Sequence, residues 1–345
     1  MTPPALSPAS PRDSADRELS GARPRFHGIV PPLVTPLAGP DILDVEGLGR
    51  LVEHVVGGGV HGLFMLGTTG EGPSLSHALQ REVIDRVVRF VAGRVPVLVG
   101  ITDASMEESV SLACAAATSG ADAVVAATPY YFPAAQEPLV RWARDLANRV
   151  PLPLLLYNMP EMTKVVLEPD TLRQLAACPN IVGVKDSSGD LDYFGRVTQL
   201  ARHERPEWTV LIGPELLLPE AHALGGHGAI PGGANVLPRL FVDLHEAVRA
   251  GDTRRVDALR ARARQLARLY DVGHMPGRIV VGLKTALSAL GICCDGVASS
   301  FETFGGEQRQ QVEAILDALE PTLFGIGSES FTVGRRRGNR EQPNG

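Results

Sequence analysis

The sequence predicts an α/β protein: a (β/α)8 TIM barrel with a C-terminal helical appendage. From Phe26 onward, short apolar runs alternate with longer amphipathic stretches, and this alternation repeats eight times within residues 26–250. The apolar runs are near-continuous, as in strands that a parallel sheet buries on both faces. A doubly wound open sheet is the alternative fold. Eight evenly spaced units with no nucleotide-binding fingerprint favour the closed barrel.

The eight apolar runs are the expected strands, in order Gly28–Val34, Gly62–Leu66, Val97–Val99, Ala123–Ala126, Leu152–Leu156, Val182–Val184, Thr209–Ile212 and Gly228–Ile230. The stretches between them are the expected helices, at Val45–Val56, Ser76–Phe90, Ser105–Thr118, Gln136–Asn148, Pro169–Ala177, Leu191–Ala201, Glu215–Leu224 and Pro238–Ala250. Several helices begin at capping side chains such as Asp44 and Ser105, and several are followed by glycine, which left-handed C-caps prefer.

Three further helical stretches follow the eighth unit, at Thr253–Tyr270, Arg278–Leu290 and Glu307–Leu319. A length of 345 residues suggests two domains at about 150 residues each. A barrel over residues 26–250 and a helical appendage over residues 251–323 account for that length without a second sheet domain. Residues 1–25 are rich in Pro, Ser, Ala and Arg, and we expect a disordered tail there and a flexible tail at residues 324–345.

The composition excludes several classes of partner. A net charge of −6 argues against a nucleic-acid or anionic-membrane surface. No apolar run approaches the roughly 20 residues of a membrane span, and the N-terminus lacks the apolar stretch of a signal peptide. The 4 cysteines form no CxxC pair, so neither a disulfide framework nor a metal site is expected. We expect a cytoplasmic protein.

Lysine is rare in this chain: of 33 Lys and Arg residues, only Lys164, Lys185 and Lys284 are lysines. Lys185 directly follows the buried run Ile-Val-Gly-Val, where desolvation would lower its pKa and free the amine as a nucleophile. An amine can form an imine with a ketone, which arginine cannot. A lysine that snorkels to solvent or pairs with Asp186 is the alternative. Lys164 falls in a loop and Lys284 in an appended helix, and neither position demands an amine.

The active site of such a barrel lies at the carboxyl ends of the strands, which together form one mouth. Tyr157 ends the strand before Lys185, and a phenol there suits the proton transfers of imine chemistry; a tyrosine capping the core is the alternative. The segment Gly67–Gly72, Gly-Thr-Thr-Gly-Glu-Gly, would present N–H groups and hydroxyls to a carboxylate, or form only a tight turn. Tyr130 and Tyr131 are either a plug at the mouth or a subunit contact, and the sequence does not choose.

Together these residues resemble the dihydrodipicolinate synthase/N-acetylneuraminate lyase family of pyruvate-dependent class I aldolases. The resemblance covers Phe26 to about Leu319, with the motifs in order at fitting strand ends. The matching segments are Gly67–Glu71 (GTTGE), Tyr157–Pro160 (YNxP), Ile181–Asp186 (the Schiff-base strand) and Gly225–Ile230 (the turn before the eighth strand). No single motif is specific, but the combination is.

The resemblance implies that Lys185 forms the imine with pyruvate or a related 2-oxo acid, and that no cofactor is needed. Tyr157 would relay protons, helped by Thr68 and by Tyr131, which in many relatives reaches across from a neighbouring subunit. The family's assemblies imply a homo-oligomer, a dimer or a homotetramer.

The resemblance also implies substrate-binding positions. Thr68 and Thr69 would hold the pyruvate carboxylate, and the Ile230 carbonyl would line the site near the pyruvate carbon. Gly213 and Glu215 stand where sialic acid lyases carry Gly-Tyr-Asp-Glu, and Glu215 is the one hydroxyl-binding candidate retained.

The subfamily is less clearly marked. In dihydrodipicolinate synthases an arginine follows the YNxP proline by two positions and binds the carboxylate of aspartate semialdehyde; here that position is Met162. We therefore expect an aldolase or lyase whose acceptor is a sugar-acid-derived or simple aldehyde. One alternative is 4-hydroxy-tetrahydrodipicolinate synthase with another residue in place of the arginine, and another is a 2-keto-3-deoxy sugar acid dehydratase.

Two other classes remain. A metal-dependent barrel enzyme would need clustered ligands, and of the 9 histidines only His227 lies beside a turn of the eighth strand. A non-catalytic binding protein is argued against by the retention of Lys185, Tyr157 and the paired threonines.

Overall fold

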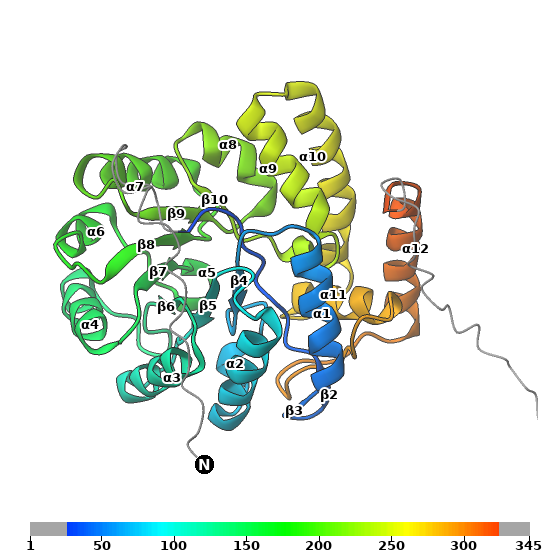
Figure 1. Cartoon of the computed structure of the whole chain (residues 1–345), viewed down its shortest axis with the longest axis horizontal. Coiled ribbons are helices and arrows are strands. Elements are labelled where there is room, and N and C mark those ends of the chain that lie inside the picture. The colour runs from blue at the N-terminus through cyan, green and yellow to red at the C-terminus, as the bar shows by residue number, and fades with distance from the viewer. Residues whose placement is uncertain (1–25, 324–345) are drawn as a thin grey trace, which may run out of the picture.

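The computed structural model describes residues 26–323, so both predicted tails lie outside the described residues. Eight parallel strands form one sheet in the order β1-β10-β9-β8-β7-β6-β5-β4, with helices around it (Figure 1). The strands are β1 (Gly28–Ile29), β4 (Leu63–Met65), β5 (Val97–Gly100), β6 (Ala123–Ala127), β7 (Leu154–Asn158), β8 (Ile181–Asp186), β9 (Thr209–Ile212) and β10 (Gly228–Ala229). All eight expected strands are present, and the (β/α)8 prediction is confirmed.

The sheet closes on itself through the segment that follows β1. Pro32 forms a parallel bridge with Phe64 of β4. The Leu33 N–H donates to the Phe64 carbonyl at 2.7 Å, and the Phe64 N–H donates to the Pro31 carbonyl at 2.9 Å. The first and last strands of the eight-stranded ladder are thereby joined, so that within residues 26–323 the barrel sheet has no open edge.

Helices surround the barrel: α1 (Val45–Gly57), α2 (His77–Val91), α3 (Met106–Ser119), α4 (Gln136–Arg149), α6 (Pro169–Leu175), α7 (Leu191–Glu204), α8 (Leu218–Ala223) and α9 (Pro238–Ala250). Two expected N-caps are observed: the Asp44 side chain accepts from the Gly47 N–H at α1, and the Ser105 side chain accepts from the Glu108 N–H at α3. The expected helix at Glu215–Leu224 is instead the short 3-10 helix η2 (Glu215–Leu217) followed by α8, whose second residue is Pro219.

Three more helices follow the barrel: α10 (Thr253–Ala267), α11 (Arg278–Ala289) and α12 (Gly306–Leu323). The 3-10 helix η4 (Arg268–Asp271) ends the stretch that was expected to be helical through Tyr270. Figure 1 shows α10 beside α9, and α12 at the margin of the molecule. The three helices lie where the sequence predicts them; the boundary between barrel and appendage at residue 250 stays a prediction.

Prolines explain the main differences in strand boundaries, because proline has no N–H to donate to a ladder. β1 ends at Ile29, ahead of Pro31 and Pro32, rather than at Val34. β7 begins after Pro153, so it runs two residues later than expected and includes Tyr157. The sequence analysis also missed five short elements: the hairpin strands β2 (Leu37–Gly39) and β3 (Ile42–Leu43), the helix α5 (Pro160–Thr163), and the 3-10 helices η1 (Gly72–Ser74) and η3 (Gly232–Asn235).

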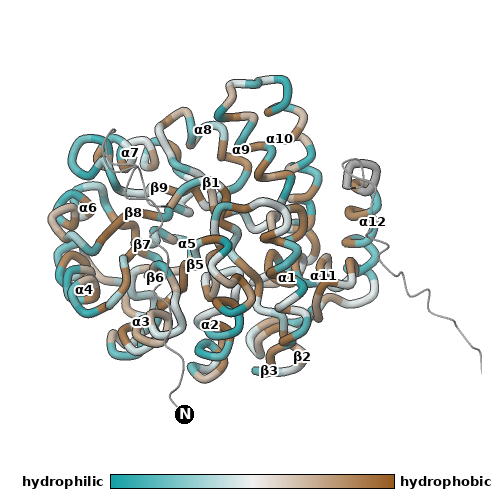
Figure 2. The backbone as a smooth tube through the Cα atoms, in the orientation of Figure 1, coloured by the Kyte–Doolittle hydropathy of each residue, from teal (hydrophilic) through white to brown (hydrophobic). Residues whose placement is uncertain are grey.

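The core has two parts. One cluster fills the barrel interior with side chains such as Val30, Leu98, Val125, Leu155 and Leu211. A larger cluster lies between the sheet and the helices. Figure 2 shows hydrophobic residues along the strands and more hydrophilic ones on the outer turns of the helices. Among the described helices, none is long and apolar enough to cross a membrane.

Histidine rings pack together at the amino end of the barrel, opposite the mouth. His61 lies between His27 and His245, with ring centroids 5.8 Å and 5.4 Å away. The Nδ1 of His61 accepts a hydrogen bond from the Ile29 N–H, whereas the buried Nδ1 of His245 has no hydrogen-bond partner. Burial, and then the neighbouring His61, lower the pKa of His245 to about 4. His245 is therefore neutral in the folded protein near neutral pH.

We predict that this histidine makes the fold acid-sensitive. The unfolded chain takes up a proton on residue 245 near its ordinary pKa of about 6.5, and the folded chain only near 4, so stability is full above 6.5 and is lost as pH falls through this window. Between pH 7 and 4.5 the free energy of unfolding should fall by about 2 kcal/mol more in the wild type than in His245→Gln. Urea titrations at both pH values measure this difference. Equal pH dependence in the two proteins would rule out the effect.

Candidate active site

Lys185 and Tyr157 face each other across two neighbouring strands at the mouth. They are register partners in the parallel pairing of β8 with β7. The Lys185 side chain is only 4% exposed, and its Nζ lies 3.8 Å from the centroid of the Tyr157 ring and 4.8 Å from that of Phe64. The barrel therefore encloses an amine between two aromatic rings. Phe64, on β4, is a neighbour that the sequence analysis missed.

The Tyr157 phenol is buried and lies 3.4 Å from the Thr68 hydroxyl. Burial raises the pKa of Tyr157, but the nearby Lys185 and hydrogen bonds with Thr68, Ser187 and Lys185 outweigh it, so the pKa lies below its ordinary value. A phenol in this setting is suited to giving and taking a proton. Ser187 is a second residue that sequence reasoning left without a role, although it follows Lys185 by only two positions.

Asp186 points away from Lys185, because successive side chains of a strand lie on opposite faces. Its Oδ1 accepts from the Asn158 side chain at 2.8 Å and from the Ser188 N–H at 3.1 Å, and its Oδ2 accepts from the Ser188 hydroxyl at 3.0 Å. Burial raises the pKa of Asp186. Asn158 also accepts a hydrogen bond from the Leu167 N–H. Asp186 is thus engaged in fixing the end of β8 against β7, and the alternative of a Lys185–Asp186 ion pair is not observed.

Thr68 and Thr69 lie half-buried in a closed turn after β4. The Glu71 N–H donates to the Thr68 carbonyl at 3.1 Å, and the Gly72 N–H donates to the Gly67 carbonyl at 3.2 Å. The Thr35 hydroxyl adds a hydrogen bond to the Gly70 carbonyl at 2.7 Å. A tight turn is therefore present, and it holds one threonine hydroxyl beside Tyr157.

Ile230, Gly213 and Glu215 follow the last two strands of the barrel. Ile230 is buried, and its N–H donates to the Ile212 carbonyl. The Gly213 N–H donates to the Asp186 carbonyl at 2.7 Å, and a Cβ on Gly213 would come within 2.0 Å of the Ser187 Oγ, so a larger residue would require Ser187 to move. This close approach brings the turn after β9 against the Lys185 strand.

Glu215 is buried, and its carboxylate joins three segments. It accepts from the Gly233 N–H at 2.8 Å and from the Tyr270 hydroxyl of η4 at 2.9 Å. Burial raises the pKa of Glu215 to about 7, against these hydrogen bonds. Tyr270, which the sequence analysis did not single out, thus connects the appendage to the turns after β9 and β10.

The structure places three other singled-out residues at the surface. Tyr131 is 73% exposed and packs edge-to-face on Phe132, itself 78% exposed. Within one chain Tyr131 is therefore not beside the buried Tyr157. Met162 is exposed on α5, and Lys164 is exposed with its Nζ donating to the Glu161 carbonyl.

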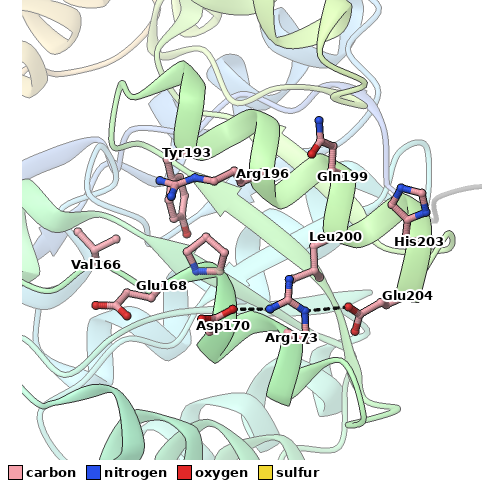
Figure 3. A pocket seen from close by; sticks show the side chains of 11 residues that line it. Val166, Glu168, Asp170, Arg173, Tyr193, Arg196, Gln199, Leu200, His203 and Glu204 are labelled. Atoms are coloured by element: carbon pink, nitrogen blue, oxygen red, sulfur yellow. Dashed lines mark hydrogen bonds and ion pairs between the residues drawn. The ribbon is translucent and has the colours of Figure 1, made fainter.

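Residues 26–323 contain no group of three or more His, Cys, Asp and Glu side chains placed to hold a metal ion. The Nδ1 of His227 accepts from the Val210 N–H at 2.9 Å, on the amino side of β10 rather than at the mouth. A groove of about 520 Å³ lies elsewhere, on the outer wall between α6 and α7. Figure 3 shows Arg173 of this groove paired with Asp170 and Glu204. Lys185 and Tyr157 are not among the residues that line it.

Curated proteins similar to this chain include synthases and lyases. The chain is 38% identical over 277 residues to a 4-hydroxy-tetrahydrodipicolinate synthase of Phenylobacterium zucineum, covering 79% of this chain and 90% of that protein. It is 36% identical over 296 residues to an uncharacterized DapA-like lyase of Halobacterium salinarum, covering 85% and 94%.

Two solved structures are similar over the barrel and the appendage. Dihydrodipicolinate synthase from Bacteroides thetaiotaomicron superposes with a TM-score of 0.83 at 46% identity, covering 86% of this chain and 100% of that one. YagE, a prophage protein from E. coli K12 in complex with pyruvate, superposes with a TM-score of 0.81 at 29% identity, covering 86% of this chain and 99% of that one. The model of the dihydrodipicolinate synthetase family matches residues 25–319. The chain therefore belongs to the dihydrodipicolinate synthetase family, class I pyruvate aldolases, and is a lyase.

Proposed function

We propose that Lys185 is the Schiff-base lysine, and that the chain makes or cleaves a 2-oxo acid through an enamine of pyruvate. The observation that carries this proposal is the enclosed Lys185 amine, 3.8 Å from the Tyr157 ring centroid. An amine in this position can attack a ketone, and the phenol beside it can carry the protons.

The chemistry balances without a cofactor. The Lys185 amine attacks the ketone carbon, the ketone oxygen leaves as water, and a C=N bond forms. Loss of a methyl proton gives an enamine, whose carbon forms a C–C bond with the aldehyde carbon while the aldehyde oxygen takes a proton. Water then hydrolyses the imine and releases the product and the free amine. Cleavage runs the same steps backward, with Tyr157 moving the protons in both directions.

Thr68 and Thr69 are the proposed carboxylate site. The glycine-flanked turn presents their hydroxyls and N–H groups, and Thr68 stands within reach of the Tyr157 phenol. A 2-oxo acid held there would place its ketone carbon near the Lys185 amine. Gly213 and the Ile230 carbonyl would line the far side, where a larger side chain on residue 213 would collide with Ser187.

We propose an uncharged aldehyde as the acceptor, either simple or derived from a sugar acid. The position of the carboxylate-binding arginine holds Met162, whose side chain is 51% exposed. Burial raises the pKa of Glu215 to about 7, so its carboxyl group is partly neutral at neutral pH. Such a group would bind a hydroxyl of the acceptor more readily than a carboxylate. The second candidate, 4-hydroxy-tetrahydrodipicolinate synthase, is favoured by the names of the similar proteins.

We also propose that copies of this chain associate through Tyr131 and Phe132. Two adjacent aromatic side chains that are 73% and 78% exposed are unusual on a monomer surface and typical of an interface. In a homo-oligomer, a dimer or a tetramer, Tyr131 would approach the mouth of a neighbouring subunit and join its proton relay.

Borohydride reduction tests the lysine assignment. In the presence of pyruvate, reduction should add one pyruvate-derived group to the protein, and peptide mass spectrometry should place it on Lys185. Lys185→Arg keeps the positive charge but cannot form an imine, so it should show no adduct. The matched control Lys164→Arg should label as the wild type does. An adduct that persists in Lys185→Arg would disprove the assignment.

A panel of aldehydes tests the acceptor. With pyruvate as donor, glyceraldehyde should give a kcat/KM at least about tenfold higher than aspartate semialdehyde, because no arginine meets the carboxylate of the latter. Met162→Arg should narrow this ratio by favouring aspartate semialdehyde. If the wild type already prefers aspartate semialdehyde, the second candidate function is correct.

Sedimentation velocity tests the association. Replacing both Tyr131 and Phe132 with serine should lower the sedimentation coefficient from that of an oligomer to that of a monomer of about 37 kDa. Ile42→Ser is the control, since Ile42 is also exposed but lies on the hairpin strand β3. A wild type that sediments as a monomer would refute the proposed association.

A further inference from the structure

Glu71 lies near the end of the Gly67–Gly72 turn, and its side chain is buried. Its backbone is left-handed, with φ of 57°, which is uncommon for a residue other than glycine. One carboxylate oxygen pairs with the Lys284 ammonium, and the other accepts from the Ala298 N–H at 2.7 Å. The side chains of Glu71 and Lys284 are both 0% exposed. A buried carboxylate is thus fully paired, and its partners come from a segment more than 200 residues away.

Lys284 reaches Glu71 from α11 of the appendage. Its Nζ also donates to the Gly296 carbonyl at 2.6 Å, in the same segment that supplies the Ala298 N–H. This segment in turn forms an antiparallel bridge to Leu37 of β2. In a chain that uses arginine for most positive charges, a lysine here provides a compact charge that fits a closed site.

The pair connects directly to the proposed carboxylate site. The Glu71 N–H closes the turn by donating to the Thr68 carbonyl at 3.1 Å, and the Thr68 hydroxyl stands 3.4 Å from the Tyr157 phenol. A movement of Glu71 would therefore move Thr68 relative to Tyr157. No other described contact of Glu71 with the appendage carries charge.

We propose that Glu71 and Lys284 are positioning residues: their buried ion pair lets the C-terminal appendage hold Thr68 and Thr69 where the carboxylate of the 2-oxo acid binds. The inference rests on the proposed function, since it assigns the pair an effect on binding at that same site. Neither residue touches the substrate, and the expected effect is on affinity rather than on the chemical step.

Other contacts keep the turn folded without the pair. The Thr35 hydroxyl binds the Gly70 carbonyl, and the Gln80 side chain donates to the Gly72 carbonyl at 2.8 Å. Loss of the pair should therefore loosen the turn rather than unfold it, and the left-handed Glu71 is the residue most free to relax.

The test measures how much pyruvate is needed to trap the Lys185 adduct. In Lys284→Met and in Glu71→Gln, the pyruvate concentration for half-maximal trapping by borohydride should rise about tenfold, while the trapping rate at saturating pyruvate falls less than about twofold. Glu71→Gln keeps an acceptor for the Ala298 N–H, so it remains informative if Lys284→Met does not fold.

The double variant Glu71→Gln/Lys284→Met tests whether the two residues act as a unit. The pyruvate concentration for half-maximal trapping should rise by about the same factor as in either single variant, because all three variants lose the same Glu71–Lys284 ion pair. A rise equal to the product of the two single effects would mean that the residues act independently, and the proposal would fail.

Arg255→Met controls for general destabilisation. Arg255 of α10 pairs with Asp243 of α9 at 2.8 Å, a contact that joins the appendage to the barrel without meeting the turn. This variant should lower the melting temperature and leave half-saturation unchanged. If it raises the pyruvate concentration for half-maximal trapping as much as Lys284→Met does, the Glu71–Lys284 pair has only a structural role.

An unchanged pyruvate concentration for half-maximal trapping in Lys284→Met and Glu71→Gln overturns this inference alone. A wild type that forms no adduct overturns the proposed function with it.

Discussion

The parallel register of β7 against β8, within a closed ring of strands, is the constraint on which the site depends. It sets Tyr157 opposite Lys185, and one residue further it sets Asn158 opposite Asp186. Because side chains alternate along a strand, the first pair faces the barrel interior and the second pair faces outward. A slip of β8 by one residue would turn Lys185 outward and Asp186 inward, and so place a carboxylate where the amine now lies. The Asn158–Asp186 hydrogen bond, itself buried, fixes this register.

Buried ionisable groups then tie loops to this frame. Three buried carboxylates accept hydrogen bonds from backbone N–H groups or from side chains of another segment: Asp186, Glu215 and Glu71. Such groups contribute little net stability, since desolvation offsets the interactions that they make. They do impose geometry, because a buried carboxylate left unpaired is costly. The appendage contacts two of these carboxylates: Tyr270 donates a hydrogen bond to Glu215, and Lys284 pairs with Glu71.

Local patterns were enough to predict the barrel, because near-continuous apolar runs and capped amphipathic helices repeat along the chain. The same patterns located Lys185, since a lysine directly after a buried run must lie at a strand end. They placed Tyr157 at the end of its strand but did not predict that β7 continues through Asn158, because that extension depends on the pairing of Asn158 with Asp186 of β8. Nor could they show that Lys284 is buried against Glu71. Helical periodicity tells which face of α11 is covered, but not what lies across from it.

The scarcity of lysine also has a practical meaning. Of the chain's three lysines, Lys185 is 4% exposed and Lys284 is 0% exposed, whereas Lys164 is exposed. Of these three side chains, a reagent that acylates primary amines therefore reaches only Lys164. A fluorophore or a surface tether attached through Lys164 would lie at the C-terminal end of α5. This selectivity among the three lysines follows from the burial of Lys185 and Lys284.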